Sequence, residues 1–409
     1  MDLLRFRWSR VRRRINVPVL QLNEWRKALP GVSSNQLRKW RRALANIPIW
    51  QVNDWIKSVS DIPISRLDQW RKSLPVSLTW QQRLAAAQHA LLKRHVQSPM
   101  RQYIVSAGST MLNTVELPAT ATESPSIPIV LTHGYGSGVG FWAAGLDMLT
   151  EENTRSVYAV DWNGMGGSNR ADFNTASDPE AYFIDPLESW RKSVKLEKMA
   201  LVGHSLGGLL SAAYAMKYPD RVSHLILVSP AGLLPAPVIS GKSTLPFAQR
   251  LIASGWAKDI TPQRLVRAVG PLGQRITNHV VKARFVNMNQ DDLVLIANYL
   301  YEISAAPPGG EKSLNAMLYP VMTGENAGVY ARNPIGERLS YLPKHIPITI
   351  MFGDRDWMYS PLIADLPLIK SGRAKLVRIE KSGHHLYIEN INQFTDTVLS
   401  TIHNNKTPH

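Results

Sequence analysis

Three residues of the kinds that catalyse acyl transfer occur along the chain in the order serine, aspartate, histidine. Ser205 is the centre of the pentapeptide Gly-His-Ser-Leu-Gly, Asp356 follows three residues after a glycine, and His384 directly follows another glycine. A serine hydroxyl becomes a strong nucleophile when an imidazole takes its proton and a carboxylate orients that imidazole. We therefore expect Ser205 as nucleophile, His384 as base and Asp356 as the orienting acid, with an acyl-enzyme as intermediate.

The pentapeptide gains meaning from the sequence around it. Residues 198–202 form an apolar, strand-like run before it, and residues 209–217 have a helix-like pattern after it. In a strand-turn-helix unit of this kind, the two glycines allow a turn tight enough to lift the serine hydroxyl clear of the sheet. The backbone N–H groups of Leu206 and Tyr135 are expected to form the oxyanion hole.

Other residues near these positions are alternatives or supports. Asp354 is the reserve candidate for the acid, and His385 is the alternative to His384 as base. His133, at the end of a predicted strand, is expected to be structural, because a general base this early breaks the usual order of the three residues. The glycine-rich residues 161–168 could cradle a phosphate, but we expect them to shape a wall of the pocket.

The elements that would position these residues alternate along the chain. Apolar runs typical of strands alternate with helix-like segments, which predicts an α/β fold with a mostly parallel sheet and helices on both faces. The predicted strands are residues 127–132, 157–161, 199–202, 225–229, 346–352 and 375–379. Residues 233–345 interrupt the alternation, and an insertion of this length predicts a helical lid over the site. We therefore divide the chain into an N-terminal extension, residues 1–96, and a catalytic domain, residues 97–409.

Composition and charge restrict the function classes. The chain has 409 residues and no cysteine, which excludes disulfides, thiol nucleophiles and cysteine-ligated metals. No apolar run reaches the roughly 18 residues that span a bilayer, and the chemistry above needs neither cofactor nor metal. Of the net charge of +16, residues 1–96 carry +14 and residues 97–409 only +2. The basic character thus belongs to the extension, whose partner we expect to be an anionic surface.

The extension contains an internal repeat of 15 residues. Tryptophan recurs in register, with an apolar residue three positions before and four positions after it, at Trp25, Trp40, Trp55 and Trp70. This spacing predicts short amphipathic helices, each with its apolar residues on one face. The row of tryptophans either packs as a small helical cap or anchors the chain to an anionic membrane or lipid-droplet surface. The second alternative is supported because Trp and paired Arg/Lys suit a headgroup boundary.

The expected location is intracellular and peripheral on a membrane or lipid surface. No nucleic-acid reading motif accompanies the charge, so nucleic acid is not an expected partner. Residues 2–16 place apolar side chains along one face with six arginines around them, which leaves a mitochondrial presequence as an alternative. Nothing in the sequence indicates the oligomeric state.

Taken together, the motifs resemble those of one family. They are Gly134-Tyr135-Gly136, Tyr158-Ala159-Val160-Asp161, Gly203-His204-Ser205-Leu206-Gly207-Gly208, and Gly353-Asp354-Arg355-Asp356-Trp357-Met358. They are similar to the lipid-metabolising α/β-hydrolases of the ABHD4/ABHD5 (CGI-58) group, which includes plant and fungal lysophospholipid acyltransferase-like proteins and a yeast cardiolipin deacylase. The resemblance implies the α/β-hydrolase fold and a glycerolipid or phospholipid substrate.

Three functions of that group stay open. They are a serine hydrolase of phospholipids or lysophospholipids, which we favour, an acyl-CoA-dependent lysophosphatidic acid acyltransferase, and a non-catalytic lipase-binding scaffold. Ser205 argues against the scaffold, because a purely binding role does not need an intact triad. Members linked to acyl transfer carry a His-x4-Asp element, whereas here His384 is followed at that spacing by Glu389. The glutamate makes acyl transfer the less supported alternative.

Overall fold

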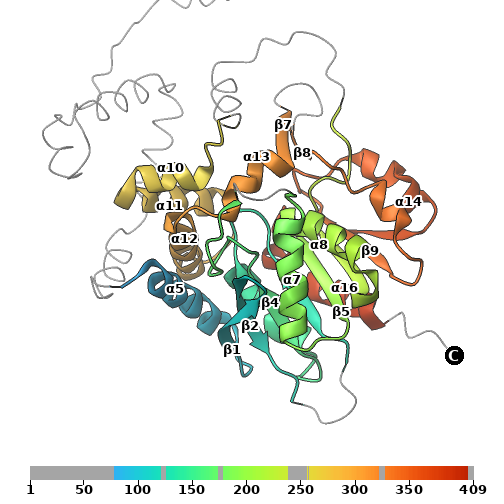
Figure 1. Ribbon diagram of the computed structural model, residues 1–409, viewed down its shortest axis with the longest axis horizontal. Helices are drawn as coiled ribbons and strands as arrows, with labels where there is room; N and C mark the ends of the chain where they lie inside the picture. Colours follow the sequence, from blue (N-terminus) through green and yellow to red (C-terminus); the bar gives the residue numbers. More distant parts are fainter. Residues whose placement is uncertain are drawn as a thin grey trace, which may run out of the picture. The chain divides into compact units, whose positions relative to one another are not determined.

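The computed structural model describes residues 78–120, 126–173, 178–237, 256, 258–321 and 328–403, which are built around an eight-stranded sheet (Figure 1). The strand order is β1-β2-β4-β3-β5-β6-β9-β10. The strands are β1 (Arg101–Ala107), β2 (Thr110–Leu117), β3 (Ile129–Thr132), β4 (Val157–Val160), β5 (Met199–His204), β6 (Val222–Val228), β9 (Ile348–Gly353) and β10 (Ala374–Ile379). All are parallel from β4 to β10, whereas β1 and β2 form an antiparallel hairpin that joins β4 through β2. The predicted mostly parallel sheet is confirmed.

The six strands predicted from apolar runs all form, with bounds shifted by a few residues. Strands β3, β4, β5 and β9 are buried along their whole length, as expected for parallel strands covered on both faces. The β1–β2 hairpin was not predicted. Its turn contains Gly108 at φ +69°, a backbone conformation that favours glycine.

Helices cover both faces of the sheet. The long ones are α5 (Trp80–His95), α7 (Ala181–Ser193), α8 (Leu206–Lys217) and α16 (Ile391–His403). Trp190 of α7 and Leu210 of α8 share a buried core with Leu201 of β5. Leu91 of α5 shares a second core with Val202, the next residue of β5. Because neighbouring strand residues point to opposite faces, α7 and α8 lie on one side of the sheet and α5 on the other.

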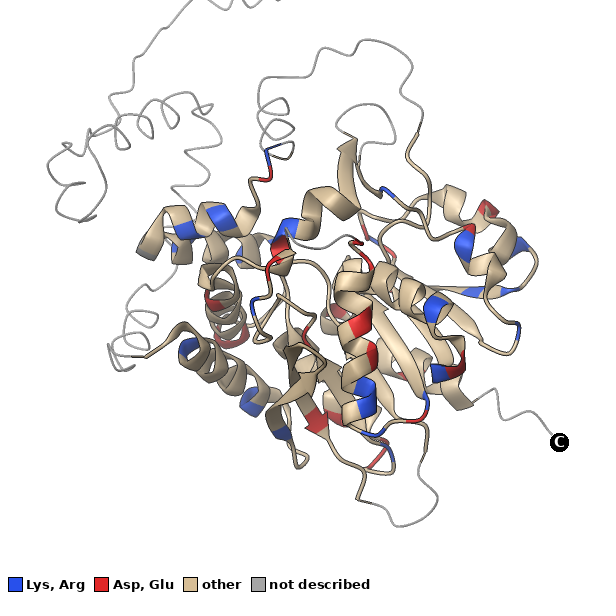
Figure 2. Cartoon of the chain, viewed as in Figure 1, with Lys and Arg blue, Asp and Glu red and all other residues tan. Residues whose placement is uncertain are grey.

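Short helices connect these elements. They are η1 (Val139–Gly145), α6 (Leu146–Leu149), η3 (Pro219–Arg221), η7 (Pro361–Asp365), α14 (Pro367–Lys370) and α15 (Leu386–Glu389). None of the described helices is both long and apolar enough to cross a membrane. Lys and Arg are interspersed with Asp and Glu over the described elements (Figure 2).

Helix α5 falls within residues 1–96, which the sequence assigned to the extension, yet it is part of the catalytic unit. It begins with a capping box formed by Thr79 and Gln82. Its Leu91 is only 2% exposed, and the helix packs against η1 and α12. The catalytic unit therefore begins before residue 97. The tryptophan repeats lie outside the described residues.

The segment between β6 and β9 contains the residues predicted to form a lid. Its described elements are α10 (Pro262–Ala268), η4 (Gly270–Leu272), α11 (Gly273–Arg284), α12 (Gln290–Ala305), η5 (Gly310–Lys312), α13 (Ser313–Met317), β7 (Leu318–Val321), β8 (Gly328–Ala331) and η6 (Arg338–Tyr341). Thr261 and Asn289 cap α10 and α12 by accepting hydrogen bonds from backbone N–H groups. Helix α12 packs against both α11 and α5, so this segment contacts a helix that comes much earlier in the chain.

Candidate active site

Ser205 lies in a strained turn between β5 and α8. Its φ of +54° belongs to a region that glycine adopts far more readily than serine. Glycines on either side make the turn possible: a Cβ on Gly203 would clash with the Gly207 carbonyl, and a Cβ on Gly207 would clash with the His133 carbonyl. The Ser205 N–H donates to the Val228 carbonyl at 2.9 Å. The turn is thereby fixed against the end of β6, with the serine at the carboxyl end of the sheet.

Asp356 and His384 meet where the loops after β9 and β10 come together. Nδ1 of His384 is 3.1 Å from Oδ1 of Asp356, and the Asp356 side chain is fully buried. Burial alone would raise the pKa of Asp356, but the hydrogen bond and charge of His384 bring it below the usual carboxyl value. The carboxylate is therefore ionised and holds the imidazole. Among the described residues, no hydrogen bond joins His384 to Ser205. In hydrolases without substrate, the bond between base and nucleophile is often long or absent.

Asp354, the reserve candidate for the acid, is engaged elsewhere. Its carboxylate accepts hydrogen bonds from the N–H groups of Lys381 (2.9 Å) and Ser382 (3.0 Å). These backbone donors lower the pKa of Asp354. Asp354 thus joins the loop after β9 to the loop that carries His384.

The loop after β3 lies directly against the serine. A Cβ on Gly134 would come 3.0 Å from the Cβ of Ser205, which shows how closely the loop approaches. Among the described residues, neither the N–H of Tyr135 nor that of Leu206 has a hydrogen-bond partner. Two unpaired backbone donors beside a serine are what an oxyanion hole requires.

The buried carboxylate of Asp161 holds this loop in place. It accepts hydrogen bonds from the N–H groups of Val139 (2.8 Å) and Gly167 (2.7 Å) and from the side-chain amide of Asn113 (2.7 Å). The same Asn113 amide donates to Gln88 of α5 at 2.8 Å. The glycine-rich turn after β4 and helix α5 therefore both support the loop beside Ser205.

His133 joins the loop after β3 to the end of β4. It is fully buried, with Nδ1 2.8 Å from the Gly134 carbonyl and Nε2 3.2 Å from the Trp162 N–H. Burial lowers the pKa of His133, so the neutral ring donates from Nδ1 and accepts at Nε2. Both ring nitrogens are occupied by backbone contacts, which fits a structural role.

His204, the second residue of the pentapeptide, contacts the backbone of His384. It is 2% exposed, with Nε2 3.0 Å from the His384 carbonyl oxygen and Nδ1 3.4 Å from the Tyr387 hydroxyl. Burial holds the pKa of His204 well below its usual value, so the neutral ring donates from Nε2. Sequence analysis missed this contact, because the motif leaves the second position undefined.

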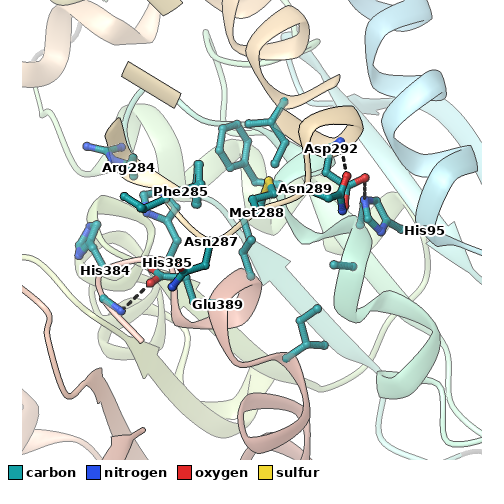
Figure 3. Close-up of a pocket in the computed structure, with 18 of the residues that line it drawn as sticks. His95, Arg284, Phe285, Asn287, Met288, Asn289, Asp292, His384, His385 and Glu389 are labelled. Atoms are coloured by element: carbon teal, nitrogen blue, oxygen red, sulfur yellow. Dashed lines mark hydrogen bonds and ion pairs between the residues drawn. The ribbon is translucent and has the colours of Figure 1, made fainter. Parts of the chain in front are cut away.

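A cavity of about 590 Å³ extends from His384 to α5 and α12 (Figure 3). His385, Arg284 and Lys381 line it, whereas Ser205 does not. His385, the alternative base, is 4% exposed and packs against Phe285 with 5.2 Å between ring centres. Within the described part of the chain its Nδ1 has no hydrogen-bond partner. The structure thus gives the carboxylate contact to His384 and leaves His385 facing the cavity.

Residues 127–391 match the family model described as the alpha/beta hydrolase fold. The chain belongs to the α/β-hydrolase family. This α/β-hydrolase is 32% identical over 286 residues to the 1-acylglycerol-3-phosphate O-acyltransferase ABHD5 of Rattus norvegicus, covering 68% of this chain and 78% of that protein. It is 33% identical over 291 residues to the (lyso)-N-acylphosphatidylethanolamine lipase of Bos taurus, covering 68% and 81%. The family resemblance predicted from the motifs is confirmed.

The solved structures agree on the fold. The carboxylesterase CesB of Bacillus subtilis superposes on this α/β-hydrolase with a TM-score of 0.56 over 80% of this chain and 99% of that chain, at 19% sequence identity. At this identity the likeness is one of architecture, and it is consistent with the family assignment.

Proposed function

We propose that this α/β-hydrolase is a serine ester hydrolase that cleaves an acyl ester of phospholipids or lysophospholipids. The hydrogen bond between His384 and Asp356, at the end of the sheet where Ser205 lies, is the observation that supports it best. The unpaired N–H groups of Tyr135 and Leu206 lie beside the same serine. These residues come from the loops after β3, β5, β9 and β10, at the same end of the sheet.

In the proposed reaction, each of these residues has one role. Asp356 keeps the proton of His384 on Nδ1, so that Nε2 is free to take the hydroxyl proton as Ser205 attacks the ester carbonyl. The N–H groups of Tyr135 and Leu206 donate to the oxyanion that forms. His384 then gives its proton to the leaving alcohol, and the acyl group remains on Ser205. Water, activated by the same base, releases the acid.

The lipid substrate is supported by the relatives. One is named an acyltransferase of 1-acylglycerol-3-phosphate and the other a lipase of (lyso)-N-acylphosphatidylethanolamine. Both names describe lipids that carry an acyl group and a phosphate. The basic, tryptophan-rich residues 1–96 also suit an enzyme that works at an anionic lipid surface.

Acyl transfer from acyl-CoA to lysophosphatidic acid is the second candidate, because relatives carry that activity in their names. In this chain the carboxylate of Glu389 accepts a hydrogen bond from the Gly383 N–H at 3.1 Å. Glu389 therefore holds the residue before His384, whichever acceptor completes the reaction. A scaffold without catalysis is the least supported, since Ser205 and its partners are all present.

Assay of the purified protein on a panel of phospholipids and lysophospholipids, with and without acyl-CoA, tests the proposal. We expect release of free fatty acid that depends on Ser205. Transfer of the acyl group from acyl-CoA to a lysophospholipid, without hydrolysis, would favour the second candidate. Binding without any turnover by the wild-type protein would favour the scaffold.

We also propose that the enzyme is intracellular and peripheral on its membrane, with the basic residues that precede α5 as a lipid anchor and residues 233–345 as a lid. Liposome co-sedimentation should increase with anionic lipid and decrease partly with salt. Changing Trp25, Trp40, Trp55 and Trp70 together to Ala should abolish sedimentation while activity on a soluble short-chain ester is kept. If the variant unfolds and the wild type ignores anionic liposomes, the tryptophans form a packed cap instead.

A further inference from the structure

The cavity of about 590 Å³ lies on the base side of the proposed catalytic residues. His384 and Trp357 form part of its wall, whereas Ser205 does not. In acyl transfer through a serine, the base gives its proton to the departing alcohol and takes a proton from the incoming acceptor. Both groups must therefore lie beside His384, while the acyl group stays with Ser205. The position of the cavity fits the alcohol rather than the acyl chain.

The cavity is positively charged near His384. Its lining includes Arg284, Arg355 and Lys381, and Figure 3 shows Arg284, His384 and His385 at one end. Arg355 is partly neutralised by Asp354, 3.6 Å away. Neither Arg284 nor Lys381 has an ion-pair partner among the described residues. Two cationic side chains are thus available to an anion beside the base.

The carboxylates of the cavity are already engaged. Glu389 accepts a hydrogen bond from the Gly383 N–H. Asp292 pairs with Arg94 at 3.2 Å and with His95 at 3.5 Å, at the opposite end of the cavity in Figure 3. Asp292 therefore does not offset the charge near His384, whereas the charge of Glu389 acts on Arg284 and offsets part of it.

His385 adds a buried polar group to the same end. Its side chain is 4% exposed and lines the cavity, and its Nδ1 has no hydrogen-bond partner among the described residues. Burial lowers the pKa of His385 well below its usual value, so the ring is neutral and has one N–H to donate. A buried polar atom without a partner is rare in a folded protein.

We propose that this cavity binds the alcohol half of the ester, as leaving group and as acceptor, and that Arg284 and Lys381 select an alcohol that carries a phosphate. The proposal rests on the proposed function, because it assigns the base role to His384. Arginine and lysine bind phosphate through charge-assisted hydrogen bonds, and the aromatic wall of Phe141 and Phe285 suits the carbon skeleton of the alcohol.

The kinetic test compares two soluble substrates with the same short acyl chain, an acylglycerol phosphate and the corresponding neutral monoacylglycerol. In the full-length protein, Arg284→Gln with Lys381→Gln should raise KM for the phosphate ester by about 10-fold or more, since each charged hydrogen bond has that scale. Activity on the neutral ester should stay within about 2-fold. Lys282→Gln, on the same helix but outside the cavity lining, is the matched control and should change neither. Equal losses on both esters, or no loss on either, would overturn the proposal.

A binding measurement separates failure of this proposal from failure of the proposed function. Glycerol 3-phosphate should bind Ser205→Ala, as measured by calorimetry, and should not bind the same protein with Arg284→Gln and Lys381→Gln. Arg284→Lys, which keeps the charge, should bind with intermediate affinity. Binding without Ser205-dependent turnover would retain the anion site and reject the hydrolase. Turnover with unchanged binding in the glutamine variants would reject the site. Inorganic phosphate and vesicles of phosphatidic acid, added as competitors, distinguish a free phosphate ligand from a lipid headgroup.

Discussion

The loops after β5 and β9 and the segment between β6 and β9 are fixed by different kinds of contact. In the loops, backbone packs on backbone: Gly203 lies against Gly207, and a Cβ on Gly353 would clash with the carbonyls of Ser382 and Gly383. The segment meets the same region through backbone contact at one point, where the Gly310 N–H donates to the Gly164 carbonyl. Elsewhere it relies on side chains, for example the Tyr135 hydroxyl, 2.9 Å from Oε1 of Gln263 on α10. Backbone packing admits few residue types, whereas side-chain contacts admit many. The loops after β5 and β9 therefore carry readable motifs, and most of the segment between β6 and β9 does not.

Removing the nucleophile should lower ester turnover more than any other change. If it did not, the loops that carry the motifs would not be the part of the molecule that catalysis depends on most. Ser205→Ala should lower ester turnover by about 10³-fold or more, because the hydroxyl initiates acylation. The fold should persist, since Ala removes one atom from a turn that glycines and the β6 contact define. Turnover on a soluble ester and circular dichroism check both points. Activity near the wild-type level, free of contaminating esterase, would reject the serine mechanism.

The two aspartates after β9 allow a comparison of turnover between two substitutions in one loop. Asp356→Asn should lower kcat by about 10²-fold or more, since it removes the carboxylate that orients His384. Asp354→Asn weakens two backbone contacts and the ion pair with Arg355 at a half-exposed site, and should cost less than about 10-fold. Steady-state kinetics of both variants on one ester decide the order. If Asp354→Asn proved the more damaged enzyme, the acid would be assigned to the wrong residue.

Substitution of His204 tests whether the position of the His384 backbone affects turnover, in addition to the reacting groups. His204→Ala should lower kcat by about 10- to 100-fold, because the His384 carbonyl loses its donor and the loop is freed. His204→Gln keeps an N–H donor at a similar reach and should recover much of that loss. The ratio of kcat between the two variants is the measurement. Equal activity of Ala and Gln variants would mean that the hydrogen bond has no positioning role.

Tyr135 tests the side-chain contacts of the covering segment and should give the smallest effect. Tyr135→Phe keeps the backbone N–H but removes the hydroxyl, whose one proton is shared between Oε1 of Gln263 and the Glu311 carbonyl. Activity on a soluble ester should fall by about 3-fold or less, the scale of one neutral hydrogen bond. Activity on vesicles should change more if these contacts control the position of the segment. A loss comparable to that of Asp356→Asn would show that the hydroxyl is needed for catalysis itself.

The difference between backbone packing and side-chain contacts also explains which features could be predicted from the sequence. The strands that precede the motifs are apolar runs buried on both faces, and such runs are visible without a structure. The β1–β2 hairpin was missed because β1 is mostly exposed or half-buried and lacks such a run. The contact of His204 and the charge of the cavity depend on side chains that come together only through the fold. Arg284 and Lys381, which both line the cavity, are almost a hundred residues apart.

Helix α5 also connects the loop beside Ser205 with helix α12. Its Gln88 accepts a hydrogen bond from Asn113, which donates to Asp161, whose carboxylate holds the loop beside Ser205. Arg83 and Arg94 of the same helix pair with Glu302 and Asp292 of α12. A protease that matured this enzyme by removing its basic residues would therefore have to cut before Thr79. Cleavage between residues 96 and 97 would take with it the helix that supports the oxyanion loop, and would inactivate the enzyme rather than release it.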